Sequence, residues 1–203
     1  MKITKITAQV KQQGRYSVFV DEKYAFSLSS TALLDSHLVP GQELTADELK
    51  NWEQASLDDK ALGRALQYAM IRPRSKWEME TYLKRKMVPP ALTESILNKL
   101  SILSMLNDLE FARSWVASRR LLRPTSMRKL QQELRAKRVA DEVIRQVLGE
   151  DETDEQDVLK EIIAKKRQLS KYKGDNLKLM QYLAGQGFSY GDIKAALEVD
   201  DEN

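Results

Sequence analysis

The sequence predicts a mostly α-helical protein, in which tandem three-helix repeats follow a small N-terminal module that contains a β-hairpin. Three observations carry this prediction. The composition is poor in turn-forming residues, with 8 glycines and 5 prolines in 203 residues. Apolar residues alternate with a period of two only near the N-terminus, and from about residue 56 they recur at helical intervals of three and four. Three segments of the helical part also resemble one another.

The β-containing module is expected to occupy the start of the chain. Residues 3–10 alternate in polarity and residues 15–20 are rich in β-forming side chains, and a glycine-containing connection joins them. This is the pattern of an antiparallel hairpin. A third strand and two short helices are expected to complete the module, at residues 24–28, 31–35 and 46–54.

A separate helix is expected to begin at Ser56, because Ser56-Leu57-Asp58-Asp59 has the form of a capping box, and to stop before Pro73. The change of period at this point divides the chain into the β-containing module and three-helix repeats one, two and three. The corresponding boundaries are 1–55, 56–107, 108–150 and 151–203.

The repeats are defined by three segments that align without gaps, beginning at Ser75, Ser126 and Asp175. Each first residue is expected to cap a helix by accepting a hydrogen bond from its first turn. Apolar residues four and eight positions later place one stripe on the buried face of that helix. These residues are Met79, Leu130 and Leu179, then Leu83, Leu134 and Leu183.

Each repeat also contains a first helix before this capped helix, and an apolar residue at the turn after it that leads into a third helix. The turn residues are Val88, Val139 and Phe188, and the third helices are expected to bury Ile96 and Leu97, Val147 and Leu148, and Ala196 and Leu197. The first helices are expected at 57–71, 109–122 and 155–171, with caps at Asn107 or Asp108 and at a capping box that begins at Thr153. Stacking of such small units predicts an elongated, curved solenoid.

Several features disfavour an enzyme. The chain has no cysteine, no glycine-rich phosphate loop and one histidine, His37, which is interpreted as a surface residue beside a turn. The acidic residues between Asp151 and Asp157 lack the spacing of a calcium loop and are interpreted as a linker and helix cap. We therefore expect no active site, no cofactor and no metal.

The location and the aromatic residues have equally simple interpretations. No run approaches the roughly 18 apolar residues of a membrane span, and the N-terminus lacks a signal-peptide core, so a cytoplasmic protein without membrane contact is expected. Trp52, Trp77 and Trp115 are the residues that would stack on bases, but core packing is the favoured interpretation.

Positive charge is concentrated in the middle of the chain. Residues 56–150 contain 19 basic and 11 acidic residues, a net charge of +8, against +3 for the whole chain. Six basic residues lie at equivalent turns of repeats one and two, and five more flank Pro124 in repeat two. They are candidates for contacts with DNA phosphates or with an acidic protein surface. A solvated helical surface is the alternative. The candidates are Lys84, Arg85, Lys86, Arg119, Arg120, Arg123, Arg128, Lys129, Arg135, Lys137 and Arg138.

Several strings, taken together and in register, resemble the signature of the RecX family over nearly the whole chain. They are Arg74-Ser75-Lys76-Trp77-Glu78, Leu83-Lys84-Arg85-Lys86, Leu106-Asn107-Asp108-Leu109-Glu110-Phe111-Ala112, Glu133-Leu134-Arg135-Ala136-Lys137 and Gly187-Phe188-Ser189-Tyr190-Gly191-Asp192-Ile193. The chain departs from the family at Met87 and Arg138, where a glycine is common. If that position needs a positive φ, a residue other than glycine adds strain of about 1 kcal/mol.

The resemblance implies a non-enzymatic regulator that binds the RecA nucleoprotein filament and restrains its ATPase, strand-exchange or filament-growth activity. Such a protein acts in DNA recombination, DNA repair and the SOS response, and here we expect a monomer with weaker, electrostatic contacts to single-stranded or double-stranded DNA. The rival hypothesis is a general DNA-binding helical repeat protein that acts without RecA. A scaffold unrelated to DNA is a third possibility, although it leaves the paired basic turns unexplained.

Overall fold

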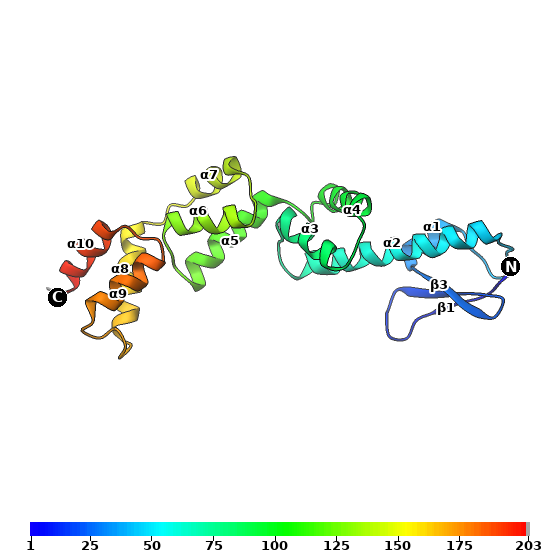
Figure 1. Cartoon of the computed structure of the whole chain (residues 1–203), viewed down its shortest axis with the longest axis horizontal. Helices are drawn as coiled ribbons and strands as arrows, with labels where there is room; N and C mark the ends of the chain where they lie inside the picture. Colours follow the sequence, from blue (N-terminus) through cyan, green and yellow to red (C-terminus); the bar gives the residue numbers. More distant parts are fainter. Residues whose placement is uncertain (202–203) are drawn as a thin grey trace. The chain divides into compact units, whose positions relative to one another are not determined.

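The computed structural model describes the backbone of residues 1–201 and the side chains of residues 1–198. Over this range the chain forms three strands and ten helices (Figure 1). The elements are β1 (Ile3–Ala8), β2 (Arg15–Val20), β3 (Lys23–Ser29), α1 (Ser30–Ser36), α2 (Ala46–Ile71), α3 (Lys76–Arg85), α4 (Pro90–Ile102), α5 (Asp108–Leu122), α6 (Met127–Ala136), α7 (Asp141–Gly149), α8 (Glu155–Arg167), α9 (Asn176–Gly185) and α10 (Tyr190–Asp201). The predicted mostly helical class is confirmed.

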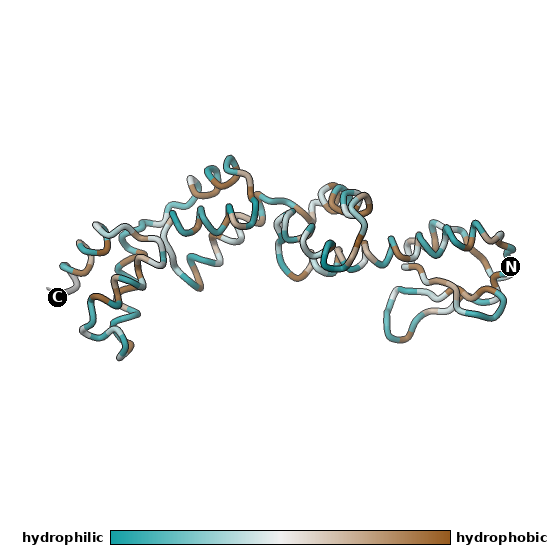
Figure 2. Tube along the Cα trace, in the orientation of Figure 1, coloured by the Kyte–Doolittle hydropathy of each residue, from teal (hydrophilic) through white to brown (hydrophobic). Residues whose placement is uncertain are grey.

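The described chain divides into two compact units, which are considered separately. The N-terminal unit comprises Met1–Arg72 and Met79–Met105. The C-terminal unit comprises Pro73–Glu78, which includes the first turn of α3, and the chain from Leu106 onward. Apolar residues recur among polar ones along the helices of both units, as helices with one buried face require (Figure 2). The predicted curved solenoid stays a prediction.

The three strands form an antiparallel sheet in the order β1-β2-β3, as the sequence predicted. One face of the sheet is covered by apolar residues that include Ile3, Val18 and Phe26, and these are almost fully buried. The indole of Trp52 in α2 stacks on the Phe26 ring, with 6.3 Å between ring centroids. Trp52 therefore belongs to the core of the module, which agrees with the core interpretation.

The expectation that a new helix begins at Ser56 is wrong, because α2 runs without a break from residue 46 to residue 71. Its capping box is formed by Thr45 and Glu48 instead. Ser56 lies in the middle of the helix with 2% of its surface exposed. Its hydroxyl accepts a hydrogen bond from the Ser27 N–H at 3.2 Å and donates one to the Ser27 carbonyl at 2.6 Å.

These bonds have a structural reason in the sheet. Strand β3 is an edge strand, and its outward N–H and carbonyl groups lack a neighbouring strand. Helix α2 supplies the missing partners, since Asp59 also accepts hydrogen bonds from the Ser29 N–H and hydroxyl. The boundary between residues 55 and 56 lies inside this helix, and the division into four segments stays a proposal.

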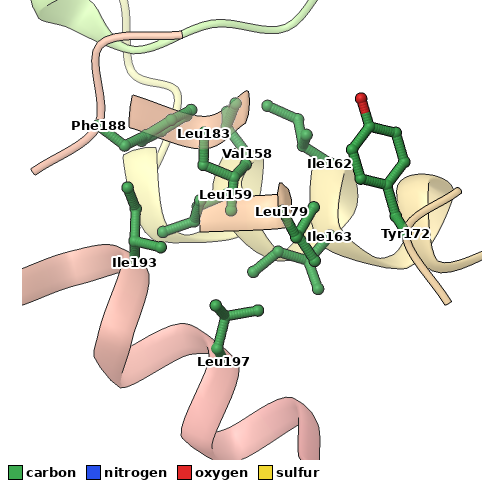
Figure 3. Close-up of a cluster of buried hydrophobic side chains, with 10 residues drawn as sticks. All are labelled: Val158, Leu159, Ile162, Ile163, Tyr172, Leu179, Leu183, Phe188, Ile193 and Leu197. Carbon is green, nitrogen blue, oxygen red and sulfur yellow. The ribbon is translucent and has the colours of Figure 1, made fainter. Parts of the chain in front are cut away.

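The predicted buried stripe of the repeats is confirmed in all three. Its six residues, Met79, Leu130 and Leu179 with Leu83, Leu134 and Leu183, each have 0% of their surface exposed. In repeat three the stripe of α9 packs against the apolar residues of α8, and α10 closes the cluster with Ile193 and Leu197 (Figure 3). Repeat two has a corresponding cluster made by α5, α6 and α7.

The caps of the second helices are also confirmed. The side chains of Ser75, Ser126 and Asp175 accept hydrogen bonds from the backbone N–H three residues later, at 3.0–3.1 Å. The first helix of repeat two is capped by Asn107, as expected. In repeat three the cap is Asp154 rather than Thr153, and α8 ends at Arg167 rather than at residue 171.

The turn after each second helix has the same backbone conformation in all three repeats. Met87, Arg138 and Gly187 have φ values of 58°, 56° and 92°. The next N–H in each repeat, that of Val88, Val139 or Phe188, donates to the carbonyl five residues earlier, and this closes the helix end as in a Schellman motif. The position therefore does require a positive φ, so Met87 and Arg138 carry the strain that glycine avoids.

The turn of repeat three also needs glycine for lack of space. A Cβ atom on Gly187 would lie 2.4 Å from the Ser126 hydroxyl oxygen and 3.0 Å from the Lys129 Cβ. Ser126 caps α6, so the start of the second helix of repeat two contacts the turn of repeat three at this point. Both repeats lie in the C-terminal unit.

A second contact of this unit fixes the connection between α7 and α8. The Arg120 guanidinium donates to the Asp151 carboxylate and to the Thr125 carbonyl, at 2.7 Å and 2.6 Å, and both side chains of the ion pair are mostly buried. Burial raises the pKa of the Asp151 carboxyl, but hydrogen bonds from Thr153 and Arg120 outweigh burial and hold that pKa below its usual value. The charged form of Asp151 therefore stabilises the fold.

Replacing any of Leu83, Leu134 and Leu183 with alanine is expected to lower the free energy of unfolding by about 2–5 kcal/mol, because each change leaves a cavity in a fully buried stripe. Denaturant unfolding of the three variants measures the losses. Near-neutral effects at all three positions would show that the repeat register is wrong.

Gly187→Ala is expected to destabilise the protein by about 1–3 kcal/mol from backbone strain alone, because alanine rarely adopts a φ of 92°. Gly149→Ala is the matched control, since Gly149 lies in α7 with open space around its Cβ position and a gain of about 0.5–1 kcal/mol is expected. Thermal unfolding in which both variants matched the parent protein would contradict the requirement for glycine.

Asp151→Asn is expected to cost about 1–3 kcal/mol at pH 7, because it leaves the Arg120 charge without its partner. The Asp151 pKa is lowered in the folded state, so this contribution is present above the unfolded-state pKa near 4 and is lost as the pH falls through the folded-state value. The gap between parent and variant should therefore narrow below about pH 4.

Asp141→Asn serves as the control for this comparison, because Asp141 forms an exposed pair with Arg135 and is expected to contribute less than about 1 kcal/mol. Chemical denaturation at pH 7 and at about pH 3.5 gives the difference in unfolding free energy between the parent protein and each of the two variants at each pH. A constant gap for Asp151→Asn at both pH values would contradict the assigned role.

Candidate interaction surface

The basic residues predicted as partner contacts separate into two groups in the structure. The first group is committed to contacts within the protein and the second extends into solvent. Arg119 and Arg120 belong to the first group, as Arg119 donates to the Glu133 carboxylate at 2.7 Å and lies over the Trp115 ring. Arg120 holds Asp151, as described above. These two side chains position neighbouring elements, so their availability to a partner is reduced.

Lys137 is the most heavily used of the predicted residues. Its ammonium group lies 2.7 Å from the Glu78 carboxylate and 5.8 Å and 5.2 Å from the ring centroids of Trp77 and Trp115. A cation between two indoles and a mostly buried carboxylate is held by cation–π and ionic attraction together. All four residues belong to the C-terminal unit, where the contact ties the first turn of α3 to repeat two.

Three further predicted residues have weaker internal contacts. The Lys129 ammonium donates to the Gly185 carbonyl at 3.1 Å, and Arg135 pairs with Asp141 at 2.7 Å on an exposed surface. Lys86 lies 5.7 Å from the Tyr82 ring centroid. Exposed pairs contribute little to stability, typically about 0–1 kcal/mol, so a partner can displace them.

The second group consists of exposed basic residues for which the described part of the chain provides no ionic or hydrogen-bonding partner to the side chain. Its members are Lys84, Arg85, Arg123, Arg128 and Arg138. Lys84 and Arg85 end α3, Arg123 follows α5, Arg128 is in the first turn of α6, and Arg138 holds the positive-φ position after α6. We call these five residues the free cations. They are the part of the predicted set that can reach a phosphate or a carboxylate of a partner.

The structure also shows how the repeat columns differ in detail. Arg138 occupies the column of Met87 and Gly187, whereas the column of Arg85 contains Ala136 in repeat two. Lys84 and Lys86 share columns with Arg135 and Lys137, so the basic turns of repeats one and two correspond. Arg85 and Arg138 have no basic residue in the matching column.

Sequence reasoning missed a groove in the C-terminal unit. The groove has a volume of about 660 Å³ and is lined by residues of α5, α6, α8 and α9 and of the segments that precede α6, follow α8 and follow α9. Lys165 and Lys166 extend along it, although neither was predicted as a contact. A sequence signal was present, since Lys165-Lys166-Arg167 is a basic run at the end of a predicted helix.

The other residues considered in the sequence have structural roles. His37 ends α1 with a φ of 53°. Asp154 caps α8 by accepting hydrogen bonds from the Gln156 and Asp157 N–H groups, which agrees with the cap interpretation. Trp115 contacts Phe111 and packs, partly buried, against the core cluster of repeat two, and its indole N–H donates to Glu133 at 2.8 Å.

The described residues form neither a cluster of metal-binding side chains nor a membrane-spanning helix. Their histidine, aspartate and glutamate side chains include no group of three that is placed to hold a metal ion. None of the described helices combines the length and the apolar character that crossing a membrane requires.

Comparisons with known proteins agree with this architecture. The model of the RecX N-terminal domain matches residues 1–45, and models of the first and second RecX three-helix domains match residues 61–100 and 107–148. A regulatory protein RecX of Listeria welshimeri is 34% identical over an alignment that covers 100% of this chain and 77% of the relative. A regulatory protein RecX of Bacillus velezensis is 36% identical, with 97% and 76% covered.

Solved structures show the same likeness. The crystal structure of a regulatory protein RecX superposes with a TM-score of 0.71 at 27% identity, covering 97% of this chain and 98% of that one. The crystal structure of RecX from Lactobacillus salivarius shares the fold, with a TM-score of 0.59 at 23% identity over 73% of this chain and 99% of that one. The family is one of regulatory proteins rather than enzymes. The resemblance seen in the motifs is therefore confirmed, and the chain belongs to the RecX family of regulatory proteins.

Proposed function

We propose that the protein binds the RecA nucleoprotein filament and restrains its ATPase, strand-exchange or filament-growth activity during DNA recombination and repair. The observation that carries the proposal is the presence of free cations at the corresponding turns of two successive repeats, in a chain of the RecX family. A nucleoprotein filament presents phosphates and protein surface at regular intervals. A protein with repeated binding turns gains affinity from several such contacts at once.

The proposal extends to the location of the protein, its oligomeric state and its contacts with DNA. The protein acts as a cytoplasmic monomer, and its influence is connected with the SOS response through the filament. Contacts with single-stranded or double-stranded DNA are weaker and electrostatic, since they rest on charge without base recognition. Arginine in the free set adds bidentate contacts to phosphates.

A general DNA-binding protein that acts without RecA is the competing function, because the same free cations favour phosphate binding. The two functions differ in stoichiometry. A filament regulator changes RecA-driven ATP hydrolysis on single-stranded DNA at substoichiometric or near-equimolar amounts. A plain DNA binder acts only when enough protein is present to occupy bare DNA.

The variant Arg128→Gln/Arg138→Gln is expected to retain its helicity, because glutamine forms helices about as well as arginine at position 128 and Arg138 lies outside α6. It is expected to inhibit RecA-dependent ATP hydrolysis less strongly than the parent protein. If phosphates are the target, the slope of log affinity against log salt should decrease by about 0.7–0.9 for each lost contact. Fluorescence anisotropy with labelled filaments across a salt series measures this slope.

The matched control is Lys99→Gln/Arg145→Gln, which removes the same charge from exposed positions on α4 and α7, outside the basic turns. It is expected to inhibit as the parent protein does. If the parent protein, Arg128→Gln/Arg138→Gln and the control bound equally across the salt series, the free cations would be residues of a solvated surface without a binding role. Inhibition that required saturation of bare DNA would favour the competing function.

A further inference from the structure

The groove between repeats two and three has features that stability does not require. Leu121 and Leu122 end α5 with 79% and 71% of their surface exposed, and Leu169, which follows α8, is 50% exposed. All three line the groove. Large aliphatic side chains that gather around one concave surface are typical of a protein-binding site.

The charge around these leucines is strongly positive. Arg119, Arg123, Lys165 and Lys166 line the groove, and Glu133 is the acidic residue among its lining residues. Glu133 is already neutralised by Arg119. Arg123 is one of the free cations, and Lys165 has only an exposed pair with Glu161 one helical turn away.

The aromatic residue of the groove is engaged by the protein itself. The Lys166 ammonium lies 4.4 Å from the centroid of the Tyr182 ring, and the Tyr172 ring lies 5.8 Å from the same centroid. Single-stranded nucleic acid binds through aromatic faces on which bases stack, whereas leucines offer no such face. The combination of exposed leucines and surplus positive charge therefore fits an acidic peptide better than a nucleic acid.

We propose that this groove binds a short acidic segment of a partner protein, whose bulky apolar side chains pack on Leu121, Leu122 and Leu169 while its carboxylates face Arg123, Lys165 and Lys166. The volume of about 660 Å³ is within the range of pockets that enclose a ligand the size of several side chains. The inference does not rest on the proposed function, because it specifies the chemistry of the segment rather than the protein that carries it.

The probe is a fluorescein-labelled peptide of about ten residues, in which glutamates alternate with leucine and phenylalanine, measured by anisotropy with the full chain at physiological salt. Binding in the micromolar range is expected. Leu121→Gln/Leu122→Gln should weaken it more than tenfold, a loss of more than about 1.4 kcal/mol, because both apolar contacts with the peptide are removed. Arg123→Gln should weaken binding about two- to fivefold.

The matched control is Met70→Gln/Ile71→Gln, which changes the corresponding exposed pair of repeat one, at the end of α2 in the N-terminal unit. Binding of the acidic peptide should be unchanged in this control. Because all four residues are exposed, both double variants are expected to keep the parent protein's circular dichroism and melting temperature. A loss of affinity then reports on the groove rather than on folding.

Four outcomes would overturn the proposal. They are failure of the acidic peptide to bind, equal binding of a peptide with serines in place of the apolar residues, and equal weakening by the control variant. The fourth is preferential binding of a short oligothymidylate that is lost in Leu121→Gln/Leu122→Gln, which would assign the groove to nucleic acid. Analytical ultracentrifugation adds one more decisive result, since self-association abolished by the same variant would assign the groove to a second copy of the chain.

Discussion

The C-terminal unit depends on one backbone carbonyl, that of Gln186, which joins repeats two and three. The Ser126 N–H, the Ser126 hydroxyl and the Thr125 hydroxyl all donate to it, at 3.2, 2.9 and 3.0 Å. The Ser126 hydroxyl oxygen also accepts from the Lys129 N–H at 3.1 Å, so a single side chain caps α6 and binds the next repeat. This close approach leaves no room for a Cβ atom on Gly187. Three donors and a helix cap are thereby satisfied in one place.

The candidate binding features follow from this connection. The groove takes one part of its lining from the end of α5 and another from α8 and α9, so its shape exists only while repeats two and three remain joined. Arg120 of α5 provides a second link between these elements. Its guanidinium donates to the Thr125 carbonyl, in the loop before α6, and to the Asp151 carboxylate, which precedes α8. A rigid support of this kind lowers the entropic cost of ordering a binding surface. Charged side chains that hold the repeats together and charged side chains available to partners therefore lie close together in the sequence, with different roles.

The sequence predicted most of the fold because its three repeats can be compared with one another. Equal spacing identified the caps at Ser75, Ser126 and Asp175 and the buried stripe, and both depend on local geometry. The prediction for Ser56 was wrong, because a serine followed by acidic residues has the pattern of a helix start. Its role is to bond the edge of β3, and its partner, Ser27, lies 29 residues away. The candidate surface was predicted in part for the same reason: the partners of Arg120 and Lys137 lie 31 and 59 residues away, which residue type and spacing do not reveal.

Amide hydrogen exchange of the parent protein, Ser126→Ala and Asp175→Ala tests the Gln186 connection most directly. Both substitutions remove a helix cap, but only Ser126 also binds another repeat. Ser126→Ala should speed exchange in the first turn of α6 and at Gln186, Gly187 and Phe188, because the turn loses a partner that holds it. Asp175→Ala should speed exchange only in the first turn of α9. If the effect of Ser126→Ala stayed within α6 and the amides of Gln186 to Phe188 kept the parent rates, the carbonyl of Gln186 would not be the connection on which the unit depends.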